Sequence, residues 1–121
     1  MTMELNCHCG NIRLSVEQAP ETLTSCNCSI CNRYGAQWGY YAPEQVEIAA
    51  AEDAAVSYRW GDGYLDFMHC TVCGCVMHYI TTDKASEAKV GINFRMAPLA
   101  DVRPIQVRHF DGADTWKFLD E

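Results

Sequence analysis

The stretch CTVCG, residues 70–74, places two cysteines three positions apart and follows them with a glycine. Such a C-x-x-C-G segment can present both sulfurs to one metal ion, because the residues between them turn and the glycine lets the backbone bend near the sulfur atoms. CHCG, residues 7–10, can do the same from the end of a strand, since residues two apart project to the same face. Together these motifs predict a closed zinc site of four thiolates from Cys7, Cys9, Cys70 and Cys73. That site would hold the first strand against a distant hairpin and would contribute directly to folding.

A second cysteine cluster, CNCSIC at residues 26–31, offers one ligand fewer. A catalytic zinc keeps three protein ligands and leaves the fourth position to water or substrate. Cys26, Cys28 and Cys31 therefore predict an open zinc site, and we expect two zinc ions per chain. Cys75, two residues beyond Cys73, leaves an alternative open. As a fourth ligand to the cluster it would close this site too, and the protein would then be a structural module without chemistry.

The chain contains eight cysteines, and such a number can also indicate disulfides, a redox-active pair or an iron–sulfur cluster. Disulfides suit a secreted chain, but the amino terminus MTMELNCHCG lacks the basic and apolar regions of a signal peptide. We therefore expect a cytoplasmic protein whose thiols stay reduced. The βαβ context of a thioredoxin-like Cys70–Cys73 pair is missing, and no spacing resembles the common ferredoxin runs.

The composition predicts one globular domain over residues 1–121, with 49% hydrophobic and 21% charged residues. Lys and Arg number 9 against 16 Asp and Glu, which gives a formal net charge of -7. This acidic excess argues against a nucleic-acid partner, which requires a basic face, and it disfavours an anionic membrane surface. No apolar run approaches the roughly 20 residues of a membrane-spanning helix. A small anionic ligand stays compatible with the composition, since one or two arginines can make a local positive pocket.

Short alternating runs separated by turn residues predict a mainly β fold. Ile12, Leu14 and Val16 alternate with polar residues, as in a half-buried strand. Further strands are predicted at 36–42, 46–48, 56–60, 65–69, 76–80, 90–94 and 105–110. The turn at 61–63 (GDG) predicts a hairpin between two of them. Helical periodicity is weak and predicts only short turns at 29–35, 49–55 and 97–102, so we expect an all-β sandwich or a similar layered sheet with few short helices.

The motifs CHCG, CNCSIC and CTVCG, in this order, resemble those of the glutathione-dependent formaldehyde-activating enzymes, a family that also contains centromere protein V-like members. The stretches GINFRMAPL and HFDGADTW add weaker support, and together these motifs cover essentially the whole chain. The resemblance implies a β-tent fold of layered antiparallel sheets stapled by zinc. It also implies that Cys7, Cys9, Cys70 and Cys73 hold a structural zinc, and that Cys26, Cys28 and Cys31 hold a catalytic one.

The activity that the resemblance implies is that of a carbon–sulfur lyase, which adds glutathione to formaldehyde to give S-hydroxymethylglutathione, or catalyses the reverse. The expected partners are thus a small thiol and a small aldehyde. Two positions depart from the family pattern. Asn27 stands where His is frequent, which can alter the surroundings of the open zinc, and Cys75 stands where a small hydroxyl residue is frequent. The competing function is a non-catalytic two-zinc structural or binding module of the same fold.

Three thiolates would donate heavily to a zinc ion and make it a weak generator of hydroxide, so the open site is expected to activate a thiol. The thiol sulfur would then add to a small carbonyl group held beside it. Tyr34, or a water near His69, is a candidate proton donor. Arg33 could pair with a glutathione carboxylate or could equally face solvent. The four histidines are expected to be structural or solvent-facing.

Overall fold

The chain folds into two β-sheets joined by short helices and turns, as seen in a computed structural model that describes residues 2–120. The strands are β1 (Met3–Asn6), β2 (Ile12–Val16), β3 (Thr22–Cys26), β4 (Trp38–Tyr41), β5 (Val46–Ala50), β6 (Ala55–Tyr58), β7 (Leu65–Cys70), β8 (Val76–Thr81), β9 (Val90–Asn93) and β10 (Gln106–Phe110). The helices are α1 (Ser29–Tyr34) and α2 (Leu99–Val102), with 3-10 turns η1 (Pro43–Gln45) and η2 (Phe94–Met96). The described part of the chain is thus mainly β with few short helices, as the sequence predicted.

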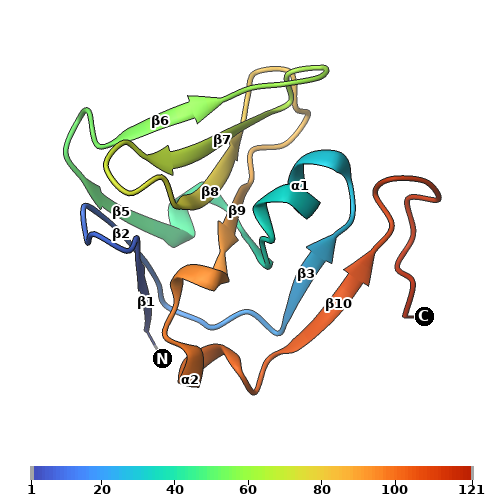
Figure 1. Ribbon diagram of the computed structural model, residues 1–121, viewed down its shortest axis with the longest axis horizontal. Coiled ribbons are helices and arrows are strands. Elements are labelled where there is room, and N and C mark those ends of the chain that lie inside the picture. Colours follow the sequence, from blue (N-terminus) through green and yellow to red (C-terminus); the bar gives the residue numbers. More distant parts are fainter. Residues whose placement is uncertain (1, 121) are drawn as a thin grey trace.

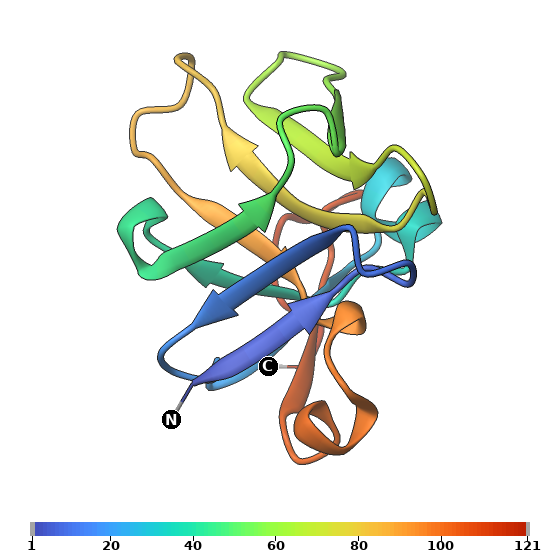
Figure 2. The same ribbon diagram turned by 90° about the vertical axis from the view of Figure 1, so that its left-hand side faces the viewer.

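The smaller sheet has three antiparallel strands in the order β1-β2-β5 (Figure 2). Its central strand buries Ile12, Leu14 and Val16 and turns the residues between them toward solvent. Leu14 pairs with Leu5 on one side and with Ile48 on the other. The alternation therefore gives this sheet an apolar face toward the core and a polar face toward water.

The larger sheet has seven strands in the order β10-β3-β4-β9-β8-β7-β6 (Figure 1). Its neighbouring strands are antiparallel except for β10 and β3, which run parallel with Phe110 opposite Cys26. This pair departs from the all-antiparallel expectation. Because of it, the chain that leaves β10 emerges at the end of β3, where the second cysteine cluster begins.

The main core combines buried residues of both sheets, including Leu5 and Leu14 from the smaller one and Leu23, Met77 and Ile92 from the larger one. Each such side chain contributes roughly 1.5–3 kcal/mol to folding through burial. A second, aromatic cluster consists of Trp38, Phe67 and Tyr79 with Ala36, and α1 packs against it through Ile30, Cys31 and Tyr34. This aromatic cluster links the helix that carries Cys31 to strands β4, β7 and β8.

Most of the strands predicted from the sequence are confirmed, as are the hairpin around the 61–63 turn and the helical turns that became α1 and α2. The prediction of a helical turn at 49–55 is wrong. Ala49 and Ala50 belong to β5 and pair with Arg13 and Ile12 of β2, so strand pairing overrides the helix preference of alanine. The short strands β1 and β3 were not predicted, because four or five residues with several polar side chains give little periodic signal. No helix within residues 2–120 is long and apolar enough to cross a membrane.

Candidate metal centres and the adjoining pocket

The cysteines of CHCG and CTVCG meet in one group, with all four sulfur atoms within 4.8 Å of one another. Cys7 follows β1 and Cys70 ends β7, so the group joins the smaller sheet to the larger one. Cys9 and Cys73 lie in the turns that follow these strands. Each turn contains a glycine at positive φ, 83° at Gly10 and 77° at Gly74, a conformation that strains any residue with a Cβ.

The spacing of these sulfurs suits a zinc ion. Cys9 Sγ lies 3.6 Å from Cys7 Sγ and 3.6 Å from Cys70 Sγ. Four sulfurs about 2.3 Å from a tetrahedral zinc lie roughly 3.8 Å from one another, so the observed distances are close to those of a zinc site. Backbone amides also point at the sulfurs: the Ile12 N–H donates to Cys7 Sγ at 3.3 Å. The amides of Cys75 and Cys9 lower the pKa of Cys73 to about 5, which favours the thiolate that a metal binds.

Cys75 lies beside this four-cysteine group. Its thiol interacts with the backbone of His8 and with the sulfur of Cys73, and its side chain packs against the main core. Within the described residues, the group around Cys28 does not include it. This placement argues against the alternative in which Cys75 closes the second site.

Cys26, Cys28 and Cys31 form the second group, again with their sulfurs within 4.8 Å of one another. Strand β3 ends at Cys26, Cys28 is the N-cap of α1, and Cys31 follows in the first turn of this helix. The Sγ of Cys28 accepts the Cys31 N–H at 3.4 Å. The start of the helix therefore fixes the geometry of two of the three sulfurs.

These three thiols need a cation if they are to ionise together. Burial raises the pKa of Cys26 and of Cys31. Burial also opposes ionisation of Cys28, but interactions with the Cys31 amide and thiol and with the Cys26 thiol outweigh it, so the pKa of Cys28 is lowered. Neighbouring thiolates repel one another. None of the residues that line the surrounding pocket is a Lys, Arg or His whose positive charge would offset this repulsion. A divalent ion that prefers thiolate ligands, zinc above all, fits this donor set.

No histidine or carboxylate joins either group within the described residues, and all eight cysteines are free, so the structure has no disulfide. Cys70 and Cys73 lie at the turn between β7 and β8 rather than at a helix start, unlike a thioredoxin-like pair. His78 is buried, and burial lowers its pKa to about 4, so its ring is uncharged at neutral pH. Disulfides and a thioredoxin-like pair therefore do not account for the two groups, whereas metal binding accounts for both.

The segment that follows β10 covers the three-cysteine group. The Asn27 amide donates to Asp111 Oδ1 at 2.9 Å, and Asn27 Oδ1 accepts the Ala113 N–H at 3.0 Å. Asp111 Oδ2 accepts both the N–H and the hydroxyl of Thr115, at 3.1 and 2.8 Å. The hydrogen bond from Asn27 and those from Thr115 lower the pKa of Asp111. Asn27 thus ties the C-terminal segment to the cysteine cluster.

Gly112 lies close to the sulfurs in this segment. A Cβ added there would lie 2.6 Å from Cys26 Sγ and 3.5 Å from the ring of Trp116, so only glycine fits. Trp116 itself has a φ of 60°, and it is the only non-glycine residue at positive φ within residues 2–120. A side chain in this region costs on the order of 1–2 kcal/mol. Strain of this kind occurs often at functional sites.

We expect the substitution Gly112→Ala to displace Cys26 and weaken metal binding at the three-cysteine group. Zinc content measured by mass spectrometry should fall from about two ions to about one per chain, while the protein stays folded by circular dichroism. Gly35→Ala is the control, because it adds the strain of a side chain at a positive φ of 63°, while the added Cβ meets no atom within 4 Å. Equal zinc contents in the two variants would contradict the assigned geometry.

A pocket of about 670 Å³ opens beside the three-cysteine group, within the size range of small-molecule sites. The three cysteines form part of its wall. Trp38, Phe67 and Tyr79 of the aromatic cluster line another part, and the loop at 60–64 and the C-terminal segment complete it. The sulfurs therefore face a space that can hold a small organic molecule.

A comparison with known protein families covers both cysteine groups. A family model described as "Glutathione-dependent formaldehyde-activating enzyme" matches residues 2–107. The chain belongs to this family. All seven cysteines of the two groups lie within the matched residues.

Among solved structures, this formaldehyde-activating family member is similar to the crystal structure of a Rhodobacter sphaeroides protein that was a structural genomics target. The TM-score is 0.69 at 20% sequence identity, over 87% of this chain and 99% of that one, which shows a shared fold. No curated protein matches the chain significantly.

Three residues that the sequence suggested for substrate binding or proton transfer do not line the pocket of this family member. Tyr34 packs edge-on against Phe67 at 5.5 Å between ring centroids, and His69 pairs with Val56. Arg33 is exposed and donates to the Ser29 carbonyl at 2.9 Å. The sequence analysis did not identify the HFDGADTW stretch as part of the site. Its Asp-Gly pair is typical of a turn, but nothing in the stretch indicates that Gly112 lies against Cys26.

Proposed function

We propose that the protein is a zinc-dependent carbon–sulfur lyase that adds a thiol, glutathione or a similar one, to a small aldehyde such as formaldehyde, or catalyses the reverse reaction. The observation that supports this most is the group of three converging cysteines in a pocket wall, which leaves a fourth coordination position to a ligand. Membership of the family supports the class of both substrates. We also propose that the protein works in the cytoplasm, where thiols stay reduced.

Under this proposal the two groups have different tasks. Cys26, Cys28 and Cys31 hold the catalytic zinc at the pocket. The four-cysteine group holds a structural zinc that joins the two sheets, through Cys7, Cys9, Cys70 and Cys73. The match between the sulfur distances and a tetrahedral site supports the second assignment.

A zinc ion held by three thiolates supplies, when bound, an open position for a thiol and lowers the pKa of that thiol. In the reaction, a bond forms between the thiol sulfur and the carbonyl carbon. The carbonyl π electrons move to the oxygen, which takes up the proton that the thiol loses. Nothing is oxidised or reduced. The protein must therefore hold both reactants together and place a hydrogen-bond donor at the carbonyl oxygen.

Two buried donors in the pocket wall suit this last task. Trp38 Nε1 is buried and has no hydrogen-bond partner among the described residues. Burial raises the pKa of Cys31, and the Trp38 N–H acts against this effect, so the indole lies near that sulfur, although no hydrogen bond of ordinary geometry joins them. Burial raises the pKa of Tyr79, and nearby Tyr40 and Cys31 add to this effect, so its hydroxyl keeps the proton. We propose that these two groups donate to the carbonyl oxygen as it gains charge.

Titration of the cobalt-substituted protein with 2-mercaptoethanol tests the proposed function. Thiol should change the visible spectrum with a limit of one equivalent per chain, because only the three-cysteine group leaves a position free. The same protein should then speed the loss of free thiol when formaldehyde is added. A spectrum that does not respond to thiol would contradict the proposal and favour the non-catalytic two-zinc module.

A further inference from the structure

Aromatic rings dominate the pocket beside the three cysteines. All three tryptophans of the chain, Trp38, Trp60 and Trp116, line it, together with Tyr40 and Tyr64. Four of these five residues are exposed to solvent. The exposed fraction is 45% for Tyr40 and Trp60, 50% for Tyr64 and 70% for Trp116. Exposed aromatic side chains gathered around one cavity indicate a binding surface for an apolar group.

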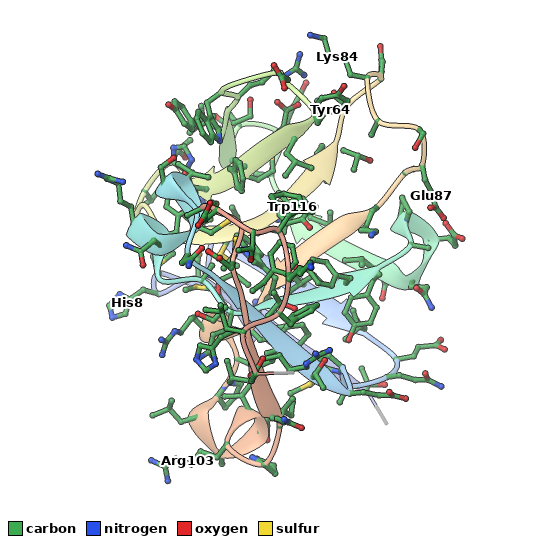
Figure 3. All side chains as sticks on the ribbon, turned by 90° about the vertical axis from the view of Figure 1, so that its right-hand side faces the viewer. His8, Tyr64, Lys84, Glu87, Arg103 and Trp116 are labelled. Atoms are coloured by element: carbon green, nitrogen blue, oxygen red, sulfur yellow. The ribbon has the colours of Figure 1, made fainter. Side chains whose placement is uncertain are left out.

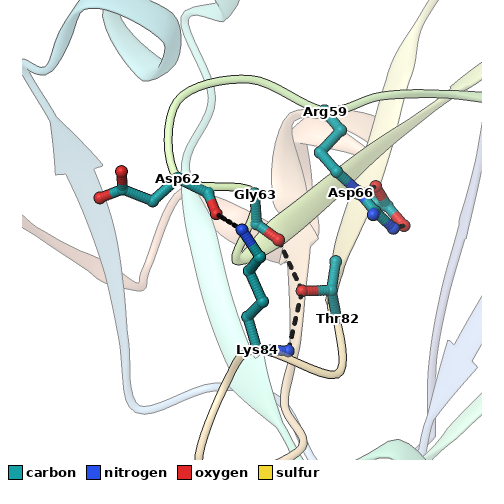
Figure 4. Close-up of polar contacts among 6 residues, drawn as sticks. All are labelled: Arg59, Asp62, Gly63, Asp66, Thr82 and Lys84. Atoms are coloured by element: carbon teal, nitrogen blue, oxygen red, sulfur yellow. Dashed lines mark hydrogen bonds and ion pairs between the residues drawn. The ribbon is translucent and has the colours of Figure 1, made fainter.

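The loop that carries Trp60 and Tyr64 is held in place by polar contacts (Figure 4). Arg59 forms a two-pronged ion pair with Asp66, with N···O distances of 2.7 and 2.8 Å. The Thr82 hydroxyl donates to the Gly63 carbonyl at 2.6 Å. These contacts fix the backbone of the loop before a ligand arrives, which lowers the entropic cost of binding.

Trp116 stands on the C-terminal segment of the same pocket. Figure 3 looks onto this face of the molecule, with Trp116 near the centre and Tyr64 above it. The indole packs edge-on against Phe110, with 5.0 Å between ring centroids. Both residues lie beyond residue 107, where the match to the family model ends. This part of the wall is thus supplied by residues outside the family match.

Charge in the pocket does not suit glutathione, which carries two carboxylates. Apart from the cysteines, Asp62 is the only ionisable lining residue that is charged at neutral pH among the described residues, and it is acidic. Two lysines lie at the edge of the pocket and not in its wall: Lys84 Nζ donates to the Asp62 carbonyl at 2.9 Å, and Lys89 Nζ lies over the Tyr40 ring, 5.5 Å from its centroid. Carboxylates placed against the wall itself would lose water without meeting a cation there, which is unfavourable.

We propose that the thiol bound by this pocket is uncharged and carries an aromatic or similarly apolar group, and that glutathione is not its preferred partner. The proposal rests on the proposed function and narrows its substrate class. The apolar group packs among Trp60, Tyr64 and Trp116, while the sulfur reaches the three-cysteine group in the same wall. The aldehyde can remain small, since the thiol supplies the contacts.

The test compares benzyl mercaptan with glutathione on the cobalt-substituted full chain, with 2-mercaptoethanol as the thiol that lacks both a ring and a carboxylate. Each thiol can ligate the metal, so the visible spectrum reports binding of all three in the same way. Benzyl mercaptan should half-saturate the site at a concentration at least tenfold below that of glutathione. Glutathione binding as tightly as benzyl mercaptan, or more tightly, would overturn the proposal.

Two variants separate the ring contacts from the charge. Trp116→Ala should weaken benzyl mercaptan about tenfold and change glutathione less than twofold, and Trp116→Phe should restore most of the loss. Asp62→Lys should strengthen glutathione several-fold, with Asp62→Asn as the control for removal of the acidic charge alone. An equal loss for both thiols in Trp116→Ala would mean that this residue supports the metal site rather than the apolar group, contrary to the proposal.

A different result identifies a failure of the proposed function itself. In that case none of the three thiols changes the cobalt spectrum. Intrinsic fluorescence then tests the pocket without ligation, because all three tryptophans line it. Benzyl alcohol, which has the ring but no thiol, should quench this fluorescence saturably in the zinc-loaded protein. Absence of quenching would overturn the apolar pocket as well.

Discussion

Replacing Cys28 with serine is expected to abolish thiol–aldehyde addition and to leave a folded protein with about one zinc ion fewer per chain. Cys28 is one of only three sulfurs in its group, so an open site that loses it has no spare ligand. The fold should survive, because Cys28 is the N-cap of α1 and serine is a preferred residue at that position. Activity should fall on the order of a thousandfold or more, since the open metal position is lost.

Zinc analysis, circular dichroism and the rate of thiol consumption together check this result. Cys75→Ser is the matched control, because it makes the same chemical change at a cysteine that belongs to neither group. The control should keep about two zinc ions and its activity. An unchanged zinc content in Cys28→Ser would show that the three-cysteine group does not hold metal.

Replacing Cys70 with serine should have the largest effect on stability. Cys70 is buried, and its sulfur lies 3.6 Å from that of Cys9 and accepts the Cys73 N–H at 3.5 Å. Structural zinc contributes about 10–16 kcal/mol in small zinc-binding peptides, whereas whole domains are stable by only about 5–15 kcal/mol. The variant is therefore expected to fail to fold stably, with low soluble yield and no cooperative transition in urea.

Cys75 is a candidate to replace Cys70 as a metal ligand in this variant, because it lies beside the four-cysteine group and interacts with Cys73. If Cys75 replaces the lost ligand, Cys70→Ser should keep a cooperative transition, and only the double variant Cys70→Ser, Cys75→Ser should lose it. If it does not, the two variants should behave alike. A double variant that melts like the parent protein would show that this group does not stabilise the fold.

The two cysteine groups could be predicted from the sequence because each depends on short motifs. Cys26, Cys28 and Cys31 lie within six residues, and one helix start brings two of their sulfurs together. The four-cysteine group required pairing two distant motifs, but each motif with its glycine already indicated half of a site. The strand around Leu14 could also be predicted, because its apolar and polar residues alternate.

The pocket could not be predicted in this way, because its wall is assembled from segments whose relative positions depend on the whole sheet. Trp60 reaches it through the hairpin loop, and Trp116 through the parallel pairing of β10 with β3. A hydrophobic pattern reports which face of a strand is buried, but not which strand lies beside it. Nothing in the sequence pattern indicated that Trp60, Tyr64 and Trp116 meet in one pocket, and the position of Gly112 against Cys26 had no local signal at all.

The parallel pairing of β10 with β3 also separates two functions along the chain. The cysteines in the pocket wall come from residues 26–31, whereas part of the wall proposed to meet the organic half of a ligand comes from residues 110–116. Under the proposed function, a change of Trp116 can thus retune which molecules are accepted and leave the metal in place, provided that Gly112 stays against Cys26. Closely related sequences that share every cysteine but differ after β10 should accordingly diverge in substrate rather than in reaction.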